Sequence, residues 1–306
     1  MSDRLPALYA LRAFEAAARH RSFTLAAREL SLTQSAVSRH IRTLEADFAC
    51  RLFEREGRGL RLTDAGEQLL PGLTAGFTAL QRACADLRGS EGVLRLKAPS
   101  TLTVRWLLAC LSRFRQAHPT LDVQLTSAWM NVDRVDFQQE PFDCAVLLSD
   151  DQFPGDWHSV RLFEEWLIPV CAPSAVAAGP WDLARLRAAQ QLHPTPDRRD
   201  WRRWLAAMQL EEQVPLQSGQ LFDMLELGIV AAARGYGVSI GDLLLVAEDV
   251  AAGRLGLPWP EAVASGDSYY LVWPRARRGQ QRFSQLAAFL QAEVASLPLP
   301  AVGYRR

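Results

Sequence analysis

The sequence of 306 residues predicts an α/β protein, preceded by an all-α-type N-terminal winged helix-turn-helix unit and a linker helix. Three observations support this fold class. Two closely spaced amphipathic helix patterns and a hairpin pattern occupy residues 22–66. A regular apolar seam follows in residues 64–88, and strand and helix patterns alternate from residue 90 onward.

Composition restricts the class of protein before any motif is considered. With 49% apolar residues, a chain of this length can form two or three well-packed domains. The N-terminus carries charges every few residues, and no run of about 18 apolar residues occurs, so we expect a cytoplasmic, nucleoid-associated protein without membrane contact. The cysteines are scattered without a CxxC pattern, which favours reduced packing residues, and we expect no metal or cofactor. They are Cys50, Cys84, Cys110, Cys144 and Cys171.

The net charge of zero hides a division along the chain. Residues 1–90 contain 13 Arg against 10 acidic residues, whereas residues 91–306 contain 21 basic and 24 acidic residues. Between Arg19 and Arg61 there are nine Arg and five acidic residues. This local excess suits phosphate contacts, although an ordinary solvated helical surface explains it equally well.

The first segment reads as two helices joined by a very short turn. Val37, Ile41, Leu44 and Phe48 recur at steps of four and three, which predicts one apolar stripe on a helix that Thr33 caps. The preceding stretch "SFTLAAREL" predicts a shorter helix, capped by Ser22 or Thr24, with an apolar inner side. That side consists of Phe23, Ala26, Ala27 and Leu30. Only Ser31 and Leu32 separate the two helices, so they form a helix-turn-helix.

The polar side of the second helix has the residue types that read DNA. Gln34, Ser38 and Arg42 lie along one line of the helix, and Ser35 and Arg39 lie along the next. Glutamine can pair with adenine, arginine with guanine, and serine with bases or phosphates. A solvated amphipathic helix is the alternative.

A hairpin pattern follows the second helix. In "RLFEREGRGLRLTDAG", residues 51–66, two extended pieces flank the turn-forming EGRG, which predicts a β-hairpin wing. Arg58 lies at its tip, where an arginine beside glycines can enter a minor groove.

Taken together, "FEAAARHRSFTLAARELSLTQSAVSRHIRTLE" and "LFEREGRGLRLTDAG" resemble the winged helix-turn-helix of the LysR-type transcriptional regulators. The resemblance covers residues 5–66 in detail and the rest of the chain in layout. It implies that positions contacting bases and phosphates fall on Gln34, Ser35, Ser38, Arg39 and Arg58, and that Thr24 and Thr33 contact the DNA backbone. One departure is "DFACRLF", where the family more often has Leu-Gly; without that glycine an easy left-handed helix end is missing.

Residues 64–88 predict one long helix with an a/d seam, bent near Pro71 and Gly72. The seam consists of Leu70, Leu73, Phe77, Leu80, Cys84 and Leu87. Pairing with a second copy and packing on its own domain are both compatible with such a seam. The resemblance implies a dimer contact here, hence a homodimer or homotetramer on a pseudo-palindromic promoter site, and it allows contact with RNA polymerase.

From residue 90 the alternation predicts α/β subdomains with mostly parallel sheets. Expected strands are "VLRLKA", "LDVQLTSA", "FDCAVLL", "LIPVCA", "VPLQS", "YGVSI" and "YYLVW", with helices at 104–116, 131–138, 201–208, 221–234, 242–251 and 280–296. The resemblance implies two lobes of the solute-binding-protein type, joined by crossovers near 163–166 and 266–269, with a small-molecule effector in the cleft. The expected domains are 1–64 (winged), 65–89 (linker) and 90–306, with lobe I at 90–164 and 268–306 and lobe II at 165–267.

Candidate effector residues lie beyond the carboxyl ends of the expected strands. In lobe I these are Ser100, Thr101 and Thr103, at a helix N-terminus that suits a carboxylate, and Trp129. In lobe II they are His193, Ser218 and Phe222. Helix caps, core aromatics and a surface histidine are the ordinary alternatives. The effector class that fits is a small organic acid or an amino-acid derivative.

Three other interpretations are possible on sequence grounds: a hydrolase, a metal site and a solute-binding protein. "GVSIG", Gly237–Gly241, matches a hydrolase nucleophile elbow, but Ser239 is expected inside a strand that follows a helix. His193, Asp197 and Asp200 could be metal ligands, but their spacing places them on no common helix face. A solute-binding protein would fit the lobes but not the winged unit. We therefore expect a regulator and not an enzyme.

Overall fold

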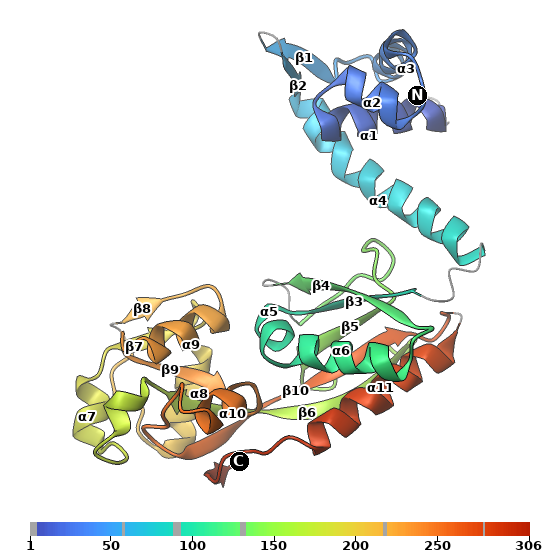
Figure 1. Cartoon of the computed structure of the whole chain (residues 1–306). Coiled ribbons are helices and arrows are strands. Elements are labelled where there is room, and N and C mark those ends of the chain that lie inside the picture. Colours follow the sequence, from blue (N-terminus) through green and yellow to red (C-terminus); the bar gives the residue numbers. More distant parts are fainter. Residues whose placement is uncertain (1–4, 57–58, 88–92, 129–132, 217–218, 278) are drawn as a thin grey trace. The chain divides into compact units, whose positions relative to one another are not determined.

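The computed structural model describes residues 5–56, 59–87, 93–128, 133–216, 219–277 and 279–306 (Figure 1). The chain divides into two compact units. The first consists of residues 1–90 with 138–141, and the second of residues 91–137 with 142–306.

The first unit begins with the helices α1 (Leu8–His20), α2 (Phe23–Glu29) and α3 (Gln34–Asp47) (Figure 1). Its core is built on α1, where Phe14 is fully buried, and on the stripe of α3 formed by Val37, Ile41 and Leu44. The predicted caps are confirmed for two helices. The Ser22 side chain accepts a hydrogen bond from the Leu25 N–H at the start of α2, and Thr33 accepts one from Ala36 at the start of α3.

The end of α3 differs from the prediction in one respect. Phe48 follows the last helical residue and is 40% exposed, so the fourth residue of the expected stripe does not enter the core. Ala49 adopts a left-handed conformation with φ of 52° even though it has a Cβ atom. The chain therefore makes the turn without a glycine, at the steric cost that a non-glycine residue has in that region.

The hairpin is confirmed by β1 (Phe53–Glu56) and β2 (Gly59–Leu62), which pair antiparallel with Phe53 opposite Leu62. Thr63 then joins the wing to the next helix. Its hydroxyl donates to the Arg51 carbonyl at 2.7 Å and accepts from the Gly66 N–H at 3.3 Å.

The helix α4 (Asp64–Leu87) continues through Pro71 as one helix. Its seam divides between two environments. Leu70, Leu73 and Phe77 are half-buried and pack against the core of their own unit, whereas Leu80 is 50% exposed and Cys84 is exposed. The alternative of packing on the chain's own domain thus holds for the first half of the seam; the side chain of Leu87 lies outside the described residues.

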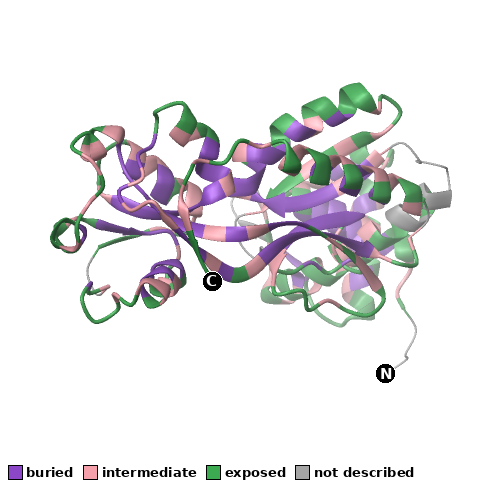
Figure 2. Cartoon of the chain, turned by 90° about the horizontal axis from the view of Figure 1, so that it is seen from below, coloured by how far each residue is buried: buried purple, intermediate pink, exposed green. Residues whose placement is uncertain are grey.

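The second unit is a long twisted sheet with helices on both sides (Figures 1 and 2). Its strands are β3 (Val93–Pro99), β4 (Asp122–Ala128), β5 (Cys144–Ser149), β6 (Trp157–Val170), β7 (Gln191–His193), β8 (Gln220–Leu221), β9 (Val238–Asp242), β10 (Glu261–Pro274) and β11 (Gly303–Arg305). Its helical segments are α5 (Ser100–Leu102), η1 (Thr103–Leu107), α6 (Leu108–Ala117), η2 (Pro173–Val176), α7 (Leu183–Ala188), α8 (Arg199–Met208), α9 (Leu225–Ala233), α10 (Leu243–Ala251) and α11 (Gln280–Ala295). Figure 2 shows that buried residues concentrate on the strands.

The strand order β4-β3-β5-β10-β6-β9-β7-β8 explains the two lobes. Parallel pairs occupy both ends, with β3 beside β4 and β5 in lobe I, and β7 beside β8 and β9 in lobe II. The long strands β6 and β10 pair antiparallel and run through both lobes. Their register shifts where Ala264 pairs with Trp166 and Ser268 with Glu164, so the two expected crossover regions lie inside these strands.

Several expected elements are wrong. Residues 133–138 form turns and no helix, because Val135 and Phe137 pack as loop residues against Phe142 and Leu147. Residues 214–216 are not a strand, consistent with the absent N–H of Pro215. The helix expected from Leu221 begins only at Leu225, after β8. The first helix of lobe I starts at Ser100 and includes a π-turn, η1.

The helices of the described ranges do not include one that is long and apolar enough to cross a membrane.

Candidate functional site

The outer face of α3 carries the candidate DNA-contacting residues. Gln34, Ser35, Arg39 and Arg42 are exposed and Ser38 is half-buried, while the opposite stripe of α3 is buried in the core. The polar side found in the sequence is therefore an accessible surface on a packed helix.

The arginines of this face differ from those on α1. Arg12 and Arg19 form ion pairs with Glu15, and Arg19 also donates two hydrogen bonds of 2.7 Å to Glu29 on α2. The hydrogen bond from Arg19 lowers the pKa of the Glu29 carboxyl, so Glu29 is charged at neutral pH. Within the described parts of the chain, Arg39 has no ion pair, which leaves its guanidinium group available for an external anion or base.

The two candidate threonines lie at helix starts. Thr33 caps α3, and its hydroxyl also lies 3.0 Å from the Ser35 hydroxyl, which fixes both at the helix N-terminus where free N–H groups attract phosphate. Thr24 is exposed in the first turn of α2, and it does not act as the cap because Ser22 does.

Glu45 couples α3 to the wing and was missed in the sequence. Its Oε1 atom accepts hydrogen bonds from the N–H groups of Leu52 at 2.9 Å and Phe53 at 3.4 Å. An open recess, to which Ser38, Arg42 and Arg51 contribute, lies between α3 and the start of the wing. A negative charge in the last turn of a helix interacts unfavourably with the helix dipole. A glutamate at that position could therefore have indicated that its carboxylate binds a partner elsewhere, here the backbone N–H groups of the wing.

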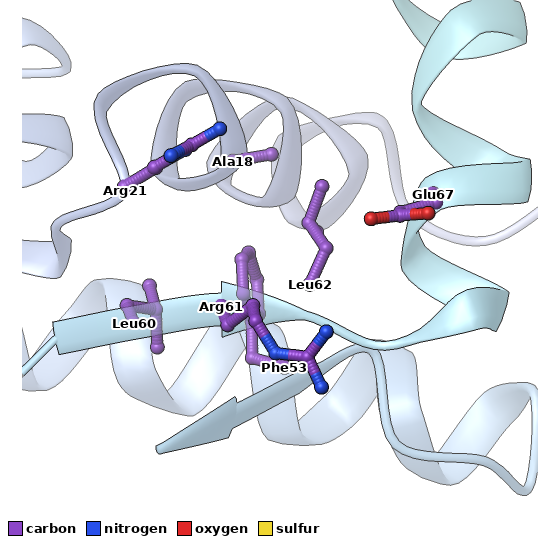
Figure 3. Close-up of a pocket in the computed structure, with 7 residues that line it drawn as sticks. All are labelled: Ala18, Arg21, Phe53, Leu60, Arg61, Leu62 and Glu67. Atoms are coloured by element: carbon purple, nitrogen blue, oxygen red, sulfur yellow. The ribbon is translucent and has the colours of Figure 1, made fainter. Parts of the chain in front are cut away.

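A second recess lies between the end of α1, the strand β2 and the first turns of α4 (Figure 3). Arg21 and Glu67 stand on opposite sides of it, and Leu62 lies between them. Arg61 pairs with Glu54 across the hairpin. Since cationic and anionic groups both line this recess, it does not have the charge pattern of a phosphate site. The hairpin tip with Arg58 lies outside the described residues.

In lobe I the candidate effector hydroxyls follow β3. Ser100 is half-buried, whereas Thr101 and Thr103 are 7% and 4% exposed. The Thr101 hydroxyl accepts a hydrogen bond of 3.1 Å from the Glu226 N–H, at the start of α9 in lobe II. The Thr103 hydroxyl is buried without a hydrogen-bond partner among the described residues. The Thr101 hydroxyl therefore lies where the two lobes meet.

In lobe II the structure brings two candidates together. His193 ends β7 and is fully buried, so it is not a surface loop residue, and its carbonyl accepts a hydrogen bond of 2.9 Å from the Phe222 N–H. Phe222 is half-buried and packs on the core of lobe II. A Cβ atom at Gly219 would lie 2.7 Å from the Nε2 atom of His193, so the backbone passes directly over the ring. Trp129 and Ser218 lie outside the described residues.

Arg105 is the residue in this region that sequence reasoning missed. It lies on η1, between Thr103 and the apolar run "WLLACL", and its guanidinium group contacts Glu226 and Asp249 of lobe II. The sequence feature that could have identified Arg105 is a lone arginine in a largely apolar helix, because a buried charge requires an oppositely charged partner.

The geometry does not support the enzyme alternatives. Ser239 is fully buried inside β9 and hydrogen-bonds to backbone carbonyls, and a Cβ atom at Gly228 would lie 2.7 Å from its hydroxyl. A nucleophile elbow needs an exposed serine on a sharp turn. The described residues contain no group of three His, Cys, Asp or Glu side chains that could hold a metal ion, which leaves His193, Asp197 and Asp200 as separate residues.

The cysteines of the described chain are all free thiols. Cys110, Cys144 and Cys171 are buried, and burial raises the pKa of the Cys110 thiol to about 12 and that of Cys171 to about 11. They are inert packing residues, whereas Cys50 and Cys84 are exposed.

Comparisons with known proteins agree with this arrangement. Residues 8–67 match the bacterial regulatory helix-turn-helix family of LysR type, and residues 87–295 match the LysR substrate binding domain. The regulator TrpI of Pseudomonas aeruginosa is 36% identical over 302 residues, covering 96% of this chain and 100% of TrpI. The glycine cleavage system transcriptional activator of Escherichia coli is 33% identical over 298 residues, covering 95% of this chain and 94% of the activator.

Solved structures show the same fold. The effector domain of AmpR from Pseudomonas aeruginosa is 26% identical, with a TM-score of 0.55, over 67% of this chain and 95% of that domain. A full-length OxyR variant from the same species has a TM-score of 0.57 at 17% identity, over 94% of this chain and 95% of that one. Regulators of this type are not enzymes, so the hydrolase alternative is wrong. The chain belongs to the LysR family of DNA-binding transcriptional regulators.

Proposed function

We propose that this regulator binds a pseudo-palindromic promoter site as a dimer or tetramer in the cytoplasm and responds to a small-molecule effector held between its two lobes. The observation that carries the proposal is the outer face of α3, with Gln34, Ser35 and Arg39 all exposed. In this proposal residues 1–64 bind DNA, 65–89 link the domains, and lobes I (90–164, 268–306) and II (165–267) bind the effector.

On DNA, the proposed roles follow from side-chain chemistry. Gln34 and Arg39 pair with base edges in the major groove, Ser35, Ser38 and Arg42 contact bases or phosphates, and Thr24 and Thr33 contact the backbone. Arg58 reaches a minor groove beside the site.

The second half of the α4 seam supports the proposed dimer. Leu80 and Cys84 are exposed along a helix whose first half is covered by its own unit, so an uncovered apolar stripe remains for a second copy. The proposed contact then uses Leu80, Cys84 and Leu87, and Leu70, Leu73 and Phe77 support it from inside the unit.

The effector class follows from the hydroxyls of Thr101 and Thr103 at the start of a helical segment, a setting that suits a carboxylate. The names of two relatives, a TrpI regulator and a glycine cleavage activator, point to amino-acid metabolism. We infer a small organic acid or an amino-acid derivative as the effector, and contact with RNA polymerase as the output. A thermal-shift screen of such compounds tests the effector, because a ligand that binds only the folded state raises the unfolding temperature.

Arg39→Ala tests the DNA-binding face. We expect it to weaken operator binding by about 1–3 kcal/mol and to lower the preference for operator over random DNA, because a bidentate contact to guanine is lost. The measurement is a gel shift at two salt concentrations on the DNA upstream of the protein's own gene.

Arg115→Ala is the matched control, since Arg115 is 73% exposed on α6, far along the chain from the winged unit. An equal loss on operator and random DNA would make Arg39 a phosphate contact. No loss on either DNA would contradict the assignment of this face.

A further inference from the structure

Arg105 connects the two lobes through a single guanidinium group. Its Nε and Nη2 atoms donate hydrogen bonds to the Glu226 carboxylate at 2.7 and 3.0 Å, and its Nη1 atom donates one of 2.7 Å to Asp249. Arg105 belongs to η1 of lobe I, whereas Glu226 lies in the first turn of α9 and Asp249 on α10, both in lobe II. All three nitrogen atoms of the guanidinium group thus donate hydrogen bonds to lobe II.

The environment makes these bonds stronger than ordinary surface ion pairs. The Arg105 side chain is only 10% exposed, and those of Glu226 and Asp249 are 20% and 21% exposed. Solvent therefore screens these ion pairs only weakly. Without the two carboxylates, the buried Arg105 would have neither an opposite charge nor hydrogen-bond acceptors beside it.

The Asp249 carboxyl is stabilised in its charged form by the arginines around it. Burial raises its pKa, but hydrogen bonds from Arg105 and Arg254 outweigh this effect, so the pKa of the Asp249 carboxyl lies below its ordinary value. Since Asp249 and Arg254 both belong to lobe II, Arg105 joins a group of charges that is already ordered there.

The same contact region contains the candidate effector residues. Thr101 accepts a hydrogen bond from the backbone N–H of Glu226, the residue whose carboxylate binds Arg105. Thr103 and Arg105 lie on the same π-turn, and such turns are frequent at functional sites. Any shift of this segment on ligand binding would move the guanidinium group relative to α9 and α10.

We propose that Arg105 is a positioning residue that fixes lobe I against lobe II through Glu226 and Asp249, and that this lock sets the relative position of the lobes at the proposed effector site. The inference rests on the proposed effector site for its purpose, but the lock itself exists without a ligand. Effector binding at Thr101 and Thr103 would then be coupled to the relative position of the lobes, because both depend on one helical segment.

Hydrogen exchange of the full chain without any added ligand tests the lock. In Arg105→Ala and in Glu226→Gln, we expect exchange to speed up roughly tenfold or more in peptides at the start of α5 and at the start of α9. The double variant should exchange no faster than Arg105→Ala, because Arg105→Ala already removes the contact that Glu226→Gln weakens. Arg105→Lys should give an intermediate rate, since it keeps the charge but cannot bridge two carboxylates.

The matched control is Arg113→Ala on the neighbouring helix α6. Arg113 pairs with Glu293 of α11, so that pair lies within lobe I, and its loss should leave the α9 peptide unchanged. Unchanged α9 exchange in Arg105→Ala, or additive effects in the double variant, would overturn the lock. If the lock holds while a screen of amino acids and small carboxylates finds no ligand, the proposed effector fails and the lock stands.

Discussion

The candidate DNA-binding residues and the candidate effector residues are presented in opposite ways. On α3 the side chains of Gln34 and Arg39 project from one helix into solvent, with their orientation set by a buried stripe on the other side. In the second unit Thr101, Thr103 and His193 are buried, and Thr101 contacts the Glu226 N–H of the other lobe.

This difference affects how each site responds to change. A site on the face of a single helix depends on that helix being folded and correctly placed on DNA, so its variants should change affinity more than stability. A site between two lobes depends on tertiary contacts such as that of Arg105 with Glu226, so its variants should change the relation of the lobes as well. Each prediction below tests one side of this contrast.

Leu80→Asp should have the largest effect of the variants considered, and it should change dimerisation and DNA binding but not effector binding. Leu80 is half-exposed in the single chain, so the substitution should leave the unit folded. In the proposed dimer it would bury two like charges in an apolar contact, at a cost of several kcal/mol. The dimer should dissociate, and operator affinity should fall by about 10²–10⁴, because the second half-site is no longer held nearby. Analytical ultracentrifugation and gel shifts measure both effects.

Leu299→Asp is the control, since Leu299 is similarly exposed at 45% but lies outside the seam. Ligand-induced stabilisation of the second unit should survive in both variants. A Leu80→Asp protein that remains dimeric and binds DNA normally would show that other surfaces hold the copies together.

The second prediction concerns carboxylates buried at the crossover. Burial, together with the charges of Asp242 and Asp200, raises the pKa of Glu165 to about 8. Burial raises that of Asp242 to about 7, although backbone hydrogen bonds partly oppose it. Glu165 stands opposite the bulge of β10, where Asp267 binds Arg203 at 2.7 Å. At neutral pH the Glu165 carboxyl is therefore mostly protonated in the folded protein.

The sign of the resulting pH dependence follows from linkage. The folded-state pKa of Glu165 lies above its ordinary value of 4.5, so its contribution to stability is complete below that pH and is lost as pH rises to about 8. Glu165→Gln should remove the part of the pH dependence that Glu165 contributes, leave the part from Asp242, and stabilise the second unit by more than about 2 kcal/mol at pH of about 8.5. Denaturant unfolding at several pH values measures it.

The winged unit provides the opposite case for comparison. Arg19 lowers the pKa of Glu29, so the contribution of Glu29 to stability is present at neutral pH and is lost as pH falls through its lowered pKa. An unfolding transition of the second unit that does not change between pH of about 5 and about 8.5 would contradict the assignment of Glu165.

The sequence was sufficient where structure is local. The start of α3 at its cap Thr33 and the paired strands 53–56 and 59–62 depend on residues close together in the chain, and periodicity and turn chemistry predict them. The role of Arg105 required contacts with residues more than 100 positions away. The split of the α4 seam has the same cause, because only the folded core shows which leucines it covers.

The surroundings of the candidate effector residues were predicted by topology only in part. The positions after β3 followed from the rule that open α/β sheets bind ligands beyond the carboxyl ends of their strands. The burial of His193 could not be foreseen from "LHPTPD". It depends on Gly219, whose backbone covers the ring, and on β8, which pairs with β7 at His193. Of the helix expected at 131–138, the described residues 133–138 are not helical for a similar reason, since tertiary packing of their apolar side chains overrides local propensity.

The smallest expected effect compares two glycines of α4 that the sequence does not distinguish. A Cβ atom at Gly66 would lie 2.4 Å from the Leu52 carbonyl oxygen and 2.8 Å from a methyl group of Leu62, whereas one at Gly72 would meet nothing within 4 Å. Gly66→Ala should therefore push the wing away from the helix and destabilise the winged unit by about 1–3 kcal/mol. Gly72→Ala should stabilise it by up to about 1 kcal/mol, since alanine favours a helix over glycine. Denaturant unfolding and operator gel shifts of the full chain compare the two variants. If Gly66→Ala were as stable as the wild type, the wing would tolerate displacement. In that case the wing would not hold α3 in place through Glu45.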